Sequence, residues 1–121
     1  MERLEKQLGL LMELDQLKSV LRRTRVKSAD GRLENSAEHS WHVALMAILM
    51  EEHANEQVDV SRVVKMLLLH DIVEIDAGDT FVYDIAASAK QEQKELEAAQ
   101  RLFDMLPQDQ GQPLLELWLE F

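Results

Sequence analysis

The side chains best suited to chemistry lie in the segment "KMLLLHDIVEIDAGDT", residues 65–80, where an apolar run leads into His70 and Asp71. An unpaired polar group in a buried helix costs on the order of 2–7 kcal/mol, and a charge costs more, so these residues need a compensating partner. Imidazole and carboxylate are common ligands of first-row divalent metals, whose positive charge would offset the buried negative charge. We therefore predict a metal site at His70 and Asp71.

The residues that follow extend this site. Glu74 lies three residues after Asp71 and four after His70, so on a helix it shares their face. Gly78 allows the chain to turn, which would return Asp79 toward the same pocket. The segment therefore predicts a cluster of His70, Asp71, Glu74 and Asp79.

A second segment, "NSAEHSWHVALMA", supplies His39 as a further candidate ligand at the start of a helix. We interpret His42 as structural, because a His-x-x-His pair without an intervening Glu fits no zinc-protease pattern. A lone histidine on an apolar face is more often a satisfied core residue than a ligand, and it is the clustering of several such groups that favours a site.

Basic residues gather between positions 22 and 32, in a chain whose formal net charge is -10. A local cationic patch on an acidic protein suits a small anion better than a long nucleic acid, which the overall charge would repel. The alternative is a solvated loop whose arginines pair with nearby carboxylates. The patch consists of Arg22, Arg23, Arg25, Lys27 and Arg32, against the single acid Asp30.

The composition indicates one domain spanning residues 1–121. Hydrophobic residues make up 46% of the 121 residues, enough for one core, and no cysteine is present, which excludes disulfides and thiolate metal sites. The longest apolar run, Val43 to Met50, is too short to span a membrane, and the N-terminus mixes both charges as no signal peptide does. We expect a cytoplasmic protein.

The elements that must position these residues are predicted to be helices. Apolar residues recur at helical spacing to about Leu21, residues 23–35 are predicted to be a loop with an Asp30-Gly31 turn, and Ser36 is predicted to cap a helix to about Glu56. That helix is apolar on nearly all sides and is expected to be central. Asp59 or Ser61 should cap the helix that carries His70, and further helices are predicted from Ser88 to Leu106, on the surface, and from Pro113 onward. The fold class is therefore all-α, a compact bundle of five or more helices.

These two segments together resemble the HD-domain metal-dependent phosphohydrolases, in particular the branch similar to bacterial 5'-deoxynucleotidases. The resemblance implies a helical fold, usually a homodimer, and release of phosphate from small nucleotides, most of all (deoxy)nucleoside 5'-monophosphates. It implies one divalent ion, Mn, Co, Zn, Fe or Mg, bound by His39, His70 and Asp71 together with a distant aspartate. It also implies that Glu74 and Asp79 line the substrate pocket and that Arg23 binds the phosphate. Metal-assisted hydrolysis would then use Glu74 or Asp79 as the catalytic general acid or base.

The chain departs from the family pattern at its end. The family's fourth ligand is an aspartate beyond a segment resembling "LELWLEF", whereas this sequence stops at Phe121. We expect the chain to be a shortened form of a longer protein. The alternative function is a catalytically weak or inactive helical module for dimerisation or partner binding. A signalling HD phosphodiesterase acting on a cyclic dinucleotide fits less well, because such proteins carry further motifs and domains.

Overall fold

Helices make up most of the computed structural model, which describes residues 2–78 and 85–121, with side chains in the second range from residue 89 onward. These residues form six α-helices, short 3-10 turns and one two-stranded sheet, so the predicted bundle of five or more helices is confirmed. None of the helices in these ranges is long and apolar enough to cross a membrane.

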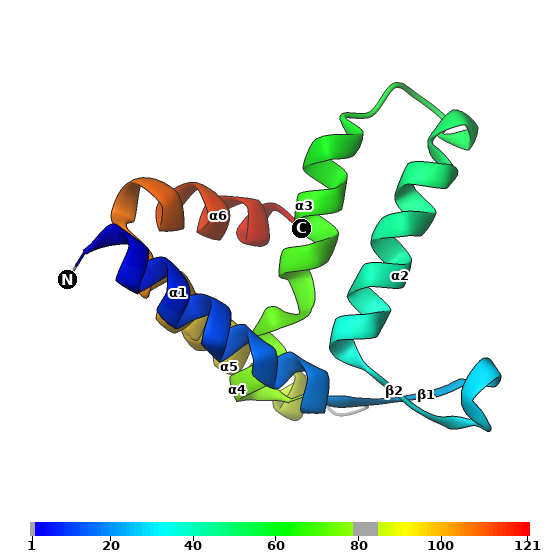
Figure 1. Ribbon diagram of the computed structural model, residues 1–121, viewed down its shortest axis with the longest axis horizontal. Coiled ribbons are helices and arrows are strands. Elements are labelled where there is room, and N and C mark those ends of the chain that lie inside the picture. Colours follow the sequence, from blue (N-terminus) through cyan, green and yellow to red (C-terminus); the bar gives the residue numbers. More distant parts are fainter. Residues whose placement is uncertain (1, 79–84) are drawn as a thin grey trace.

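Figure 1 shows the order of the elements along the described residues. The bounds are α1 Arg3–Leu14, η1 Asp15–Ser19, β1 Leu21–Val26, η2 Lys27–Ala29, β2 Arg32–Asn35, α2 Ser36–Leu49, η3 Glu51–His53, α3 Val60–His70, η4 Asp71–Val73, α4 Glu74–Ala77, α5 Ile85–Asp104 and α6 Gln108–Glu120. The first helix ends at Leu14 and passes into a 3-10 turn, so the prediction of a helix to about Leu21 was too long.

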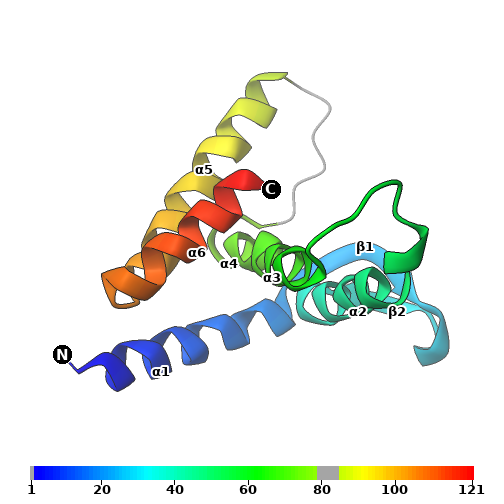
Figure 2. The same ribbon diagram turned by 90° about the horizontal axis from the view of Figure 1, so that it is seen from above.

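The hydrophobic core lies around α5, which packs against α4, η4 and α6 (Figure 2). Leu10 of α1 belongs to the same core cluster. The sequence predicted α5 as a surface helix with a wet face and an apolar one, and Ala99, Leu102 and Phe103 of that apolar face are buried. The core consists of Leu10, Leu17, Ile72, Val73, Ala98, Ala99, Leu102, Phe103 and Leu106. Since Ile72 and Val73 directly follow Asp71, the core anchors the segment that carries the predicted chemistry.

The arginine-rich segment is a β-hairpin, not the loop that the sequence predicted. Strands β1 and β2 pair antiparallel, with Arg25 opposite Leu33, and an irregularity in register lies between Leu21 and Arg25. The predicted turn is confirmed: Asp30 and Gly31 have positive φ angles of 54° and 75°, which favour these residue types. The strands were missed because a two-stranded ribbon with polar residues on both faces lacks the alternation that reveals a half-buried strand.

Helix α2 lies beside α3 and continues directly from the hairpin (Figure 1). Its N-cap is Asn35, whose side chain accepts from the Glu38 backbone N–H in a capping box, so the prediction of Ser36 as the cap was one residue late. The helix is also not central, because Trp41 is 61% exposed and Leu49 is 74% exposed. An apolar sequence on all sides indicated burial, but only one face of α2 contacts the described chain.

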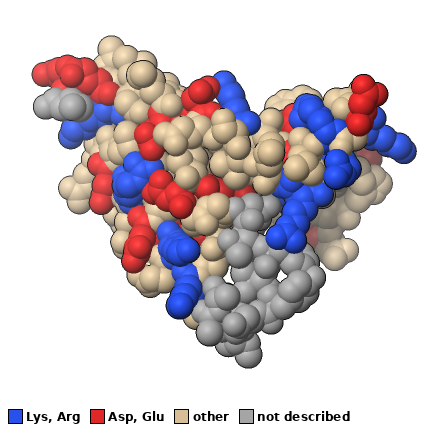
Figure 3. Space-filling model, turned by 90° about the horizontal axis from the view of Figure 1, so that it is seen from below, with Lys and Arg blue, Asp and Glu red and all other residues tan. Residues whose placement is uncertain are grey.

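The basic residues of the hairpin lie together at one end of the molecule. In Figure 3, Lys and Arg side chains are concentrated on the hairpin side, whereas the opposite side mixes acidic and basic groups. One of the hairpin arginines, Arg32, forms an ion pair with Glu38 in the first turn of α2, with atoms 2.6 Å apart. This pair and the Asn35 backbone N–H hold the pKa of Glu38 at about 2. The hairpin is thereby fastened to the start of α2.

Helices α5 and α6 approach each other closely at Gly111, so a substitution at this position tests how tightly they pack. A Cβ added there would collide with the Phe103 carbonyl oxygen, whereas one added at Gly9 in α1 would find only Met105 Cε at 3.9 Å. We predict that Gly111→Ala lowers the free energy of unfolding by about 1–3 kcal/mol through overpacking. Gly9→Ala, the matched helical control, should raise it by about 0.5–1 kcal/mol. Urea denaturation of both variants checks this, and equal effects would contradict the close approach of α5 and α6.

Candidate functional site

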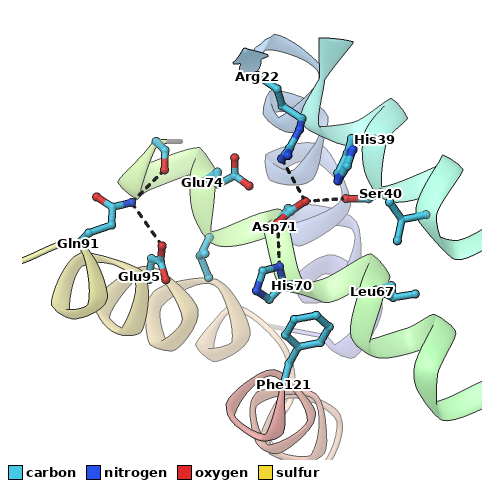
Figure 4. A pocket seen from close by; sticks show the side chains of 13 residues that line it. Arg22, His39, Ser40, Leu67, His70, Asp71, Glu74, Gln91, Glu95 and Phe121 are labelled. Carbon is cyan, nitrogen blue, oxygen red and sulfur yellow. Dashed lines mark hydrogen bonds and ion pairs between the residues drawn. The ribbon is translucent and has the colours of Figure 1, made fainter. Parts of the chain in front are cut away.

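One pocket of about 370 Å³ brings together most of the predicted site residues (Figure 4). Its wall is formed by the hairpin, the first turns of α2, the α3–α4 junction, α5 and the residue after α6. The lining residues are Arg22, His39, Ser40, Val43, Leu67, His70, Asp71, Val73, Glu74, Gly78, Gln91, Glu95 and Phe121. The predicted His39, His70, Asp71 and Glu74 therefore share one cavity, of a size typical for small-ligand sites. Asp79 lies outside the described residues.

The Asp71 carboxylate lies at the centre of this pocket and joins three elements (Figure 4). Its Oδ1 is 2.9 Å from His70 Nδ1, and its Oδ2 lies 3.5 Å from Ser40 Oγ and 3.9 Å from Arg22 Nη1. Burial favours the neutral acid, but the hydrogen bonds with His70 and Glu74 and the nearby charges outweigh it, so the pKa of Asp71 is lowered. The hydrogen bond to Asp71 in turn raises the pKa of His70.

The second imidazole, His39, is oriented by a carboxylate as well. Its Nδ1 lies 2.9 Å from Glu34 Oε1, which comes from β2. Because Nδ1 of each ring contacts a carboxylate, the Nε2 atoms of His39 and His70 are the nitrogens left for a ligand in the pocket. This pattern, in which a carboxylate orients a histidine, is common around metal-binding imidazoles.

Glu74 is the buried acid of the site, with a relative exposure of 8%. Its Oε1 accepts a hydrogen bond of 3.0 Å from the hydroxyl of Ser36, which is fully buried at the start of α2. The capping box turns the chain at this point, so the same local structure places Ser36 against Glu74 and His39 in the pocket. Glu74 is therefore held in one orientation at the pocket wall.

The arginine in the pocket is Arg22, and its neighbour Arg23 is exposed and does not line the cavity. Consecutive residues on a strand project to opposite faces, which separates these two. Among the described residues, Arg22 Nε is the buried side-chain polar atom without a hydrogen-bond partner, and it lies 3.5 Å from Glu34 Oε1. The Glu34 carboxylate is therefore the charge partner of Nε, and the terminal guanidinium nitrogens are the donors left for an anion in the pocket. The prediction that Arg23 binds phosphate stays a prediction.

The donor types in the pocket fit a divalent metal. Two imidazoles and one carboxylate are a suitable set for a first-row ion. In the described ranges, however, no three His, Asp or Glu side chains lie close enough to hold an ion as they stand. Asp71 is engaged by His70, Ser40 and Arg22, so a metal would compete with these contacts. Convergence of His39, His70 and Asp71 on one ion stays a prediction.

Several lining residues could not be identified from the sequence. Arg22 depends on the register of a hairpin that was not predicted, as does Glu34, which contacts Arg22 and His39 from outside the lining. Gln91 and Glu95 enter from α5, whose placement follows from tertiary packing. Gln91 Nε2 donates to the Gly78 carbonyl at 3.1 Å and thereby links α5 to the end of α4. The only sequence signal for Arg22 was its membership of the basic cluster.

Comparison with known proteins gives a consistent picture. A family model for the HD domain matches residues 14–121. The chain is 30% identical over 114 residues to a human protein named 5'-deoxynucleotidase HDDC2 and 32% identical over 115 residues to its Bos taurus counterpart. Each match covers 94% of this chain and 54% of the relative, so the chain spans about half the length of these proteins.

A solved structure is also similar. It is the crystal structure of a predicted metal-dependent phosphohydrolase from Magnetospirillum magnetotacticum MS-1, with a TM-score of 0.86 and 50% sequence identity. The similarity covers 98% of this chain and 59% of that one. The resemblance predicted from the two segments is therefore confirmed.

The contact between Ser36 and Glu74 leads to a stability prediction. Ser36→Ala removes a hydroxyl that donates to a buried carboxylate, and we expect the free energy of unfolding at neutral pH to fall by about 1–3 kcal/mol. Ser40→Ala is the matched control on the same helix face, since its 3.5 Å contact is at the limit of a hydrogen bond, and it should cost less than about 1 kcal/mol. Chemical denaturation measures both. A larger loss for Ser40→Ala would contradict the assigned role of Ser36.

Proposed function

The chain belongs to the HD domain family, and we propose that it is a metal-dependent phosphohydrolase that releases phosphate from (deoxy)nucleoside 5'-monophosphates. The observation that carries this proposal is the single pocket that joins Arg22, two imidazoles and the buried Glu74. This reaction needs a cation for the phosphate, donor atoms for a metal and a carboxyl group for proton transfer.

His39, His70 and Asp71 are the residues that would hold the divalent ion. When bound, such an ion supplies positive charge that polarises a phosphoryl oxygen and lowers the pKa of a coordinated water. The metal is Mn, Co, Zn, Fe or Mg in this proposal, because the donor set of two imidazoles and a carboxylate does not distinguish among them.

Arg22 is the residue that we assign to the phosphate. Its guanidinium is partly buried in the pocket wall, with Nε lacking a hydrogen-bond partner among the described residues. A guanidinium donates to two phosphate oxygens at once and would stabilise the charge that develops on them. Its weak contact with Asp71, at 3.9 Å, leaves it able to turn toward a bound anion.

Glu74 is the candidate general acid or base. Its carboxylate is buried and held by Ser36, so it is positioned for proton transfer with little reorganisation. Asp79, five residues later, is proposed on the resemblance to share this role. The products would be a nucleoside and inorganic phosphate.

The substrate class is supported by the printed names of the human and bovine relatives, which are 5'-deoxynucleotidases. The pocket volume of about 370 Å³ also suits a mononucleotide better than a polymer. The net charge of -10 favours the same choice, because it disfavours long nucleic acid.

The alternative is a helical dimerisation or partner-binding module with little activity. The observation that favours it is the apolar surface of α2, where Trp41, Met46 and Leu49 are at least half exposed. We propose a homodimer as the assembly in either case, on the resemblance to the family. Activity separates the two functions, because such a module would release little or no phosphate under any metal condition.

A phosphate-release screen tests the enzyme directly. Nucleoside and deoxynucleoside 5'-monophosphates are incubated with the protein and added Mn²⁺, Co²⁺, Zn²⁺, Fe²⁺ or Mg²⁺. We predict activity with at least one metal, and a loss of about 10²–10⁴ in kcat for Glu74→Gln, because the proton-transfer group is removed while its shape is kept. Glu92→Gln, an exposed residue of α5, is the control. No release from any nucleotide with any metal would contradict the proposed function.

The neighbouring arginines provide a second test. Arg22→Ala should lower kcat/KM for the monophosphate by about 10²–10³, since a donor to the phosphoryl oxygens is lost. Arg23→Ala should change it far less, because Arg23 does not line the pocket. Steady-state kinetics on both variants shows which arginine contacts the phosphate. A larger loss of kcat/KM for Arg23→Ala than for Arg22→Ala would assign the phosphate contact to Arg23.

A further inference from the structure

The side chain of Glu34 joins three groups through one oxygen atom. Its Oε1 lies 2.9 Å from His39 Nδ1, 3.0 Å from Thr24 Oγ1 and 3.5 Å from Arg22 Nε. The side chain is only 17% exposed, and it comes from β2 immediately before the capping residue of α2. Its contact with His39 was described above, but the same oxygen also reaches Arg22, and neither the metal, the phosphate nor the proton-transfer role was assigned to Glu34 itself.

The contact with His39 fixes which ring nitrogen carries the proton. A carboxylate accepts hydrogen bonds, so its partner Nδ1 must be the protonated nitrogen of a neutral imidazole. The lone pair is then on Nε2, the nitrogen available to the pocket that His39 lines. Without Glu34 the ring could adopt either tautomer and could rotate about its side-chain bonds.

The contact with Arg22 is made by the same oxygen, Oε1. A negative charge 3.5 Å from Nε keeps the guanidinium on the pocket side of β1 and leaves its terminal nitrogens available to an anion. Thr24 lies on β1, as Arg22 does, and its hydroxyl donates a hydrogen bond to the Glu34 carboxylate. This hydrogen bond limits the movement of the carboxylate. One side chain therefore sets the positions of groups from β1 and α2.

We propose that Glu34 is a positioning residue of this site, which holds His39 in the tautomer that can bind a metal and keeps Arg22 facing the phosphate position. The inference rests on the proposed function for its metal and phosphate. Its first consequence, the protonation of Nδ1, concerns the chain alone and is testable without either ligand.

The tautomer is read from the ¹⁵N chemical shifts of the imidazoles in metal-free protein at about pH 8, where an ordinary imidazole is neutral. The His39 signals are assigned by their loss in His39→Gln. We expect the proton on Nδ1 in the wild type and a shift toward the Nε2 tautomer in Glu34→Ala. A proton on Nε2 of the wild-type ring overturns the proposal, and this result does not depend on whether Glu34→Ala folds.

Metal affinity gives the second readout, with Mn²⁺ as the probe and calorimetry as the measurement. Glu34→Ala should weaken Mn²⁺ binding by about 10–100-fold, as loss of an orienting carboxylate does elsewhere. Glu34→Gln should recover part of the affinity, because its amide oxygen can still accept from Nδ1. Glu52→Gln, an exposed residue of η3, is the matched control and should bind as the wild type does.

The outcomes separate the two proposals. If the wild type binds no Mn²⁺, the proposed metal site fails, while the tautomer measurement still decides the role of Glu34 toward His39. If the wild type binds Mn²⁺ and Glu34→Ala binds it equally well, the positioning role is wrong and the metal site stands.

Discussion

The partly buried carboxylate of Asp71 is the group around which the rest of the site is arranged. A carboxylate at this depth needs compensation, and it receives it from His70 beside it, from Ser40 of α2 and from Arg22 of the hairpin. These partners come from three elements that are distant in the sequence. The hairpin, α2 and the end of α3 therefore meet around one acid, and the pocket is the space that remains between them.

The rest of the chain holds that junction rigid. The core around α5 buries Ile72 and Val73, directly after Asp71. On the outer side, Arg101 of α5 forms a bidentate ion pair with Asp76, with distances of 2.6 and 2.7 Å, and a further bond of 2.7 Å to Glu13 of α1. The short segment that carries Glu74 is thus held by the core packing of Ile72 and Val73 and by the ion pair between Arg101 and Asp76.

The sequence predicted the parts of the site whose geometry is local. The spacing of His70, Asp71 and Glu74 places them together on any helix that ends near Gly78, so no tertiary information was needed. Arg22 and Glu34 could not be chosen over their neighbours, because their direction depends on strand pairing in a ribbon without apolar alternation. The apolar pattern of α2 likewise could not say that one of its faces would stay exposed, since burial depends on the partners that the fold supplies.

The most direct test of this account is a crystal structure of the protein grown with Mn²⁺, with the ion located by its anomalous scattering. The account predicts one strong peak in the pocket, within bonding distance of Nε2 of both His39 and His70 and of a carboxylate oxygen of Asp71. A peak elsewhere, or a pocket in which these three groups remain apart while Mn²⁺ is bound at another position, would contradict it.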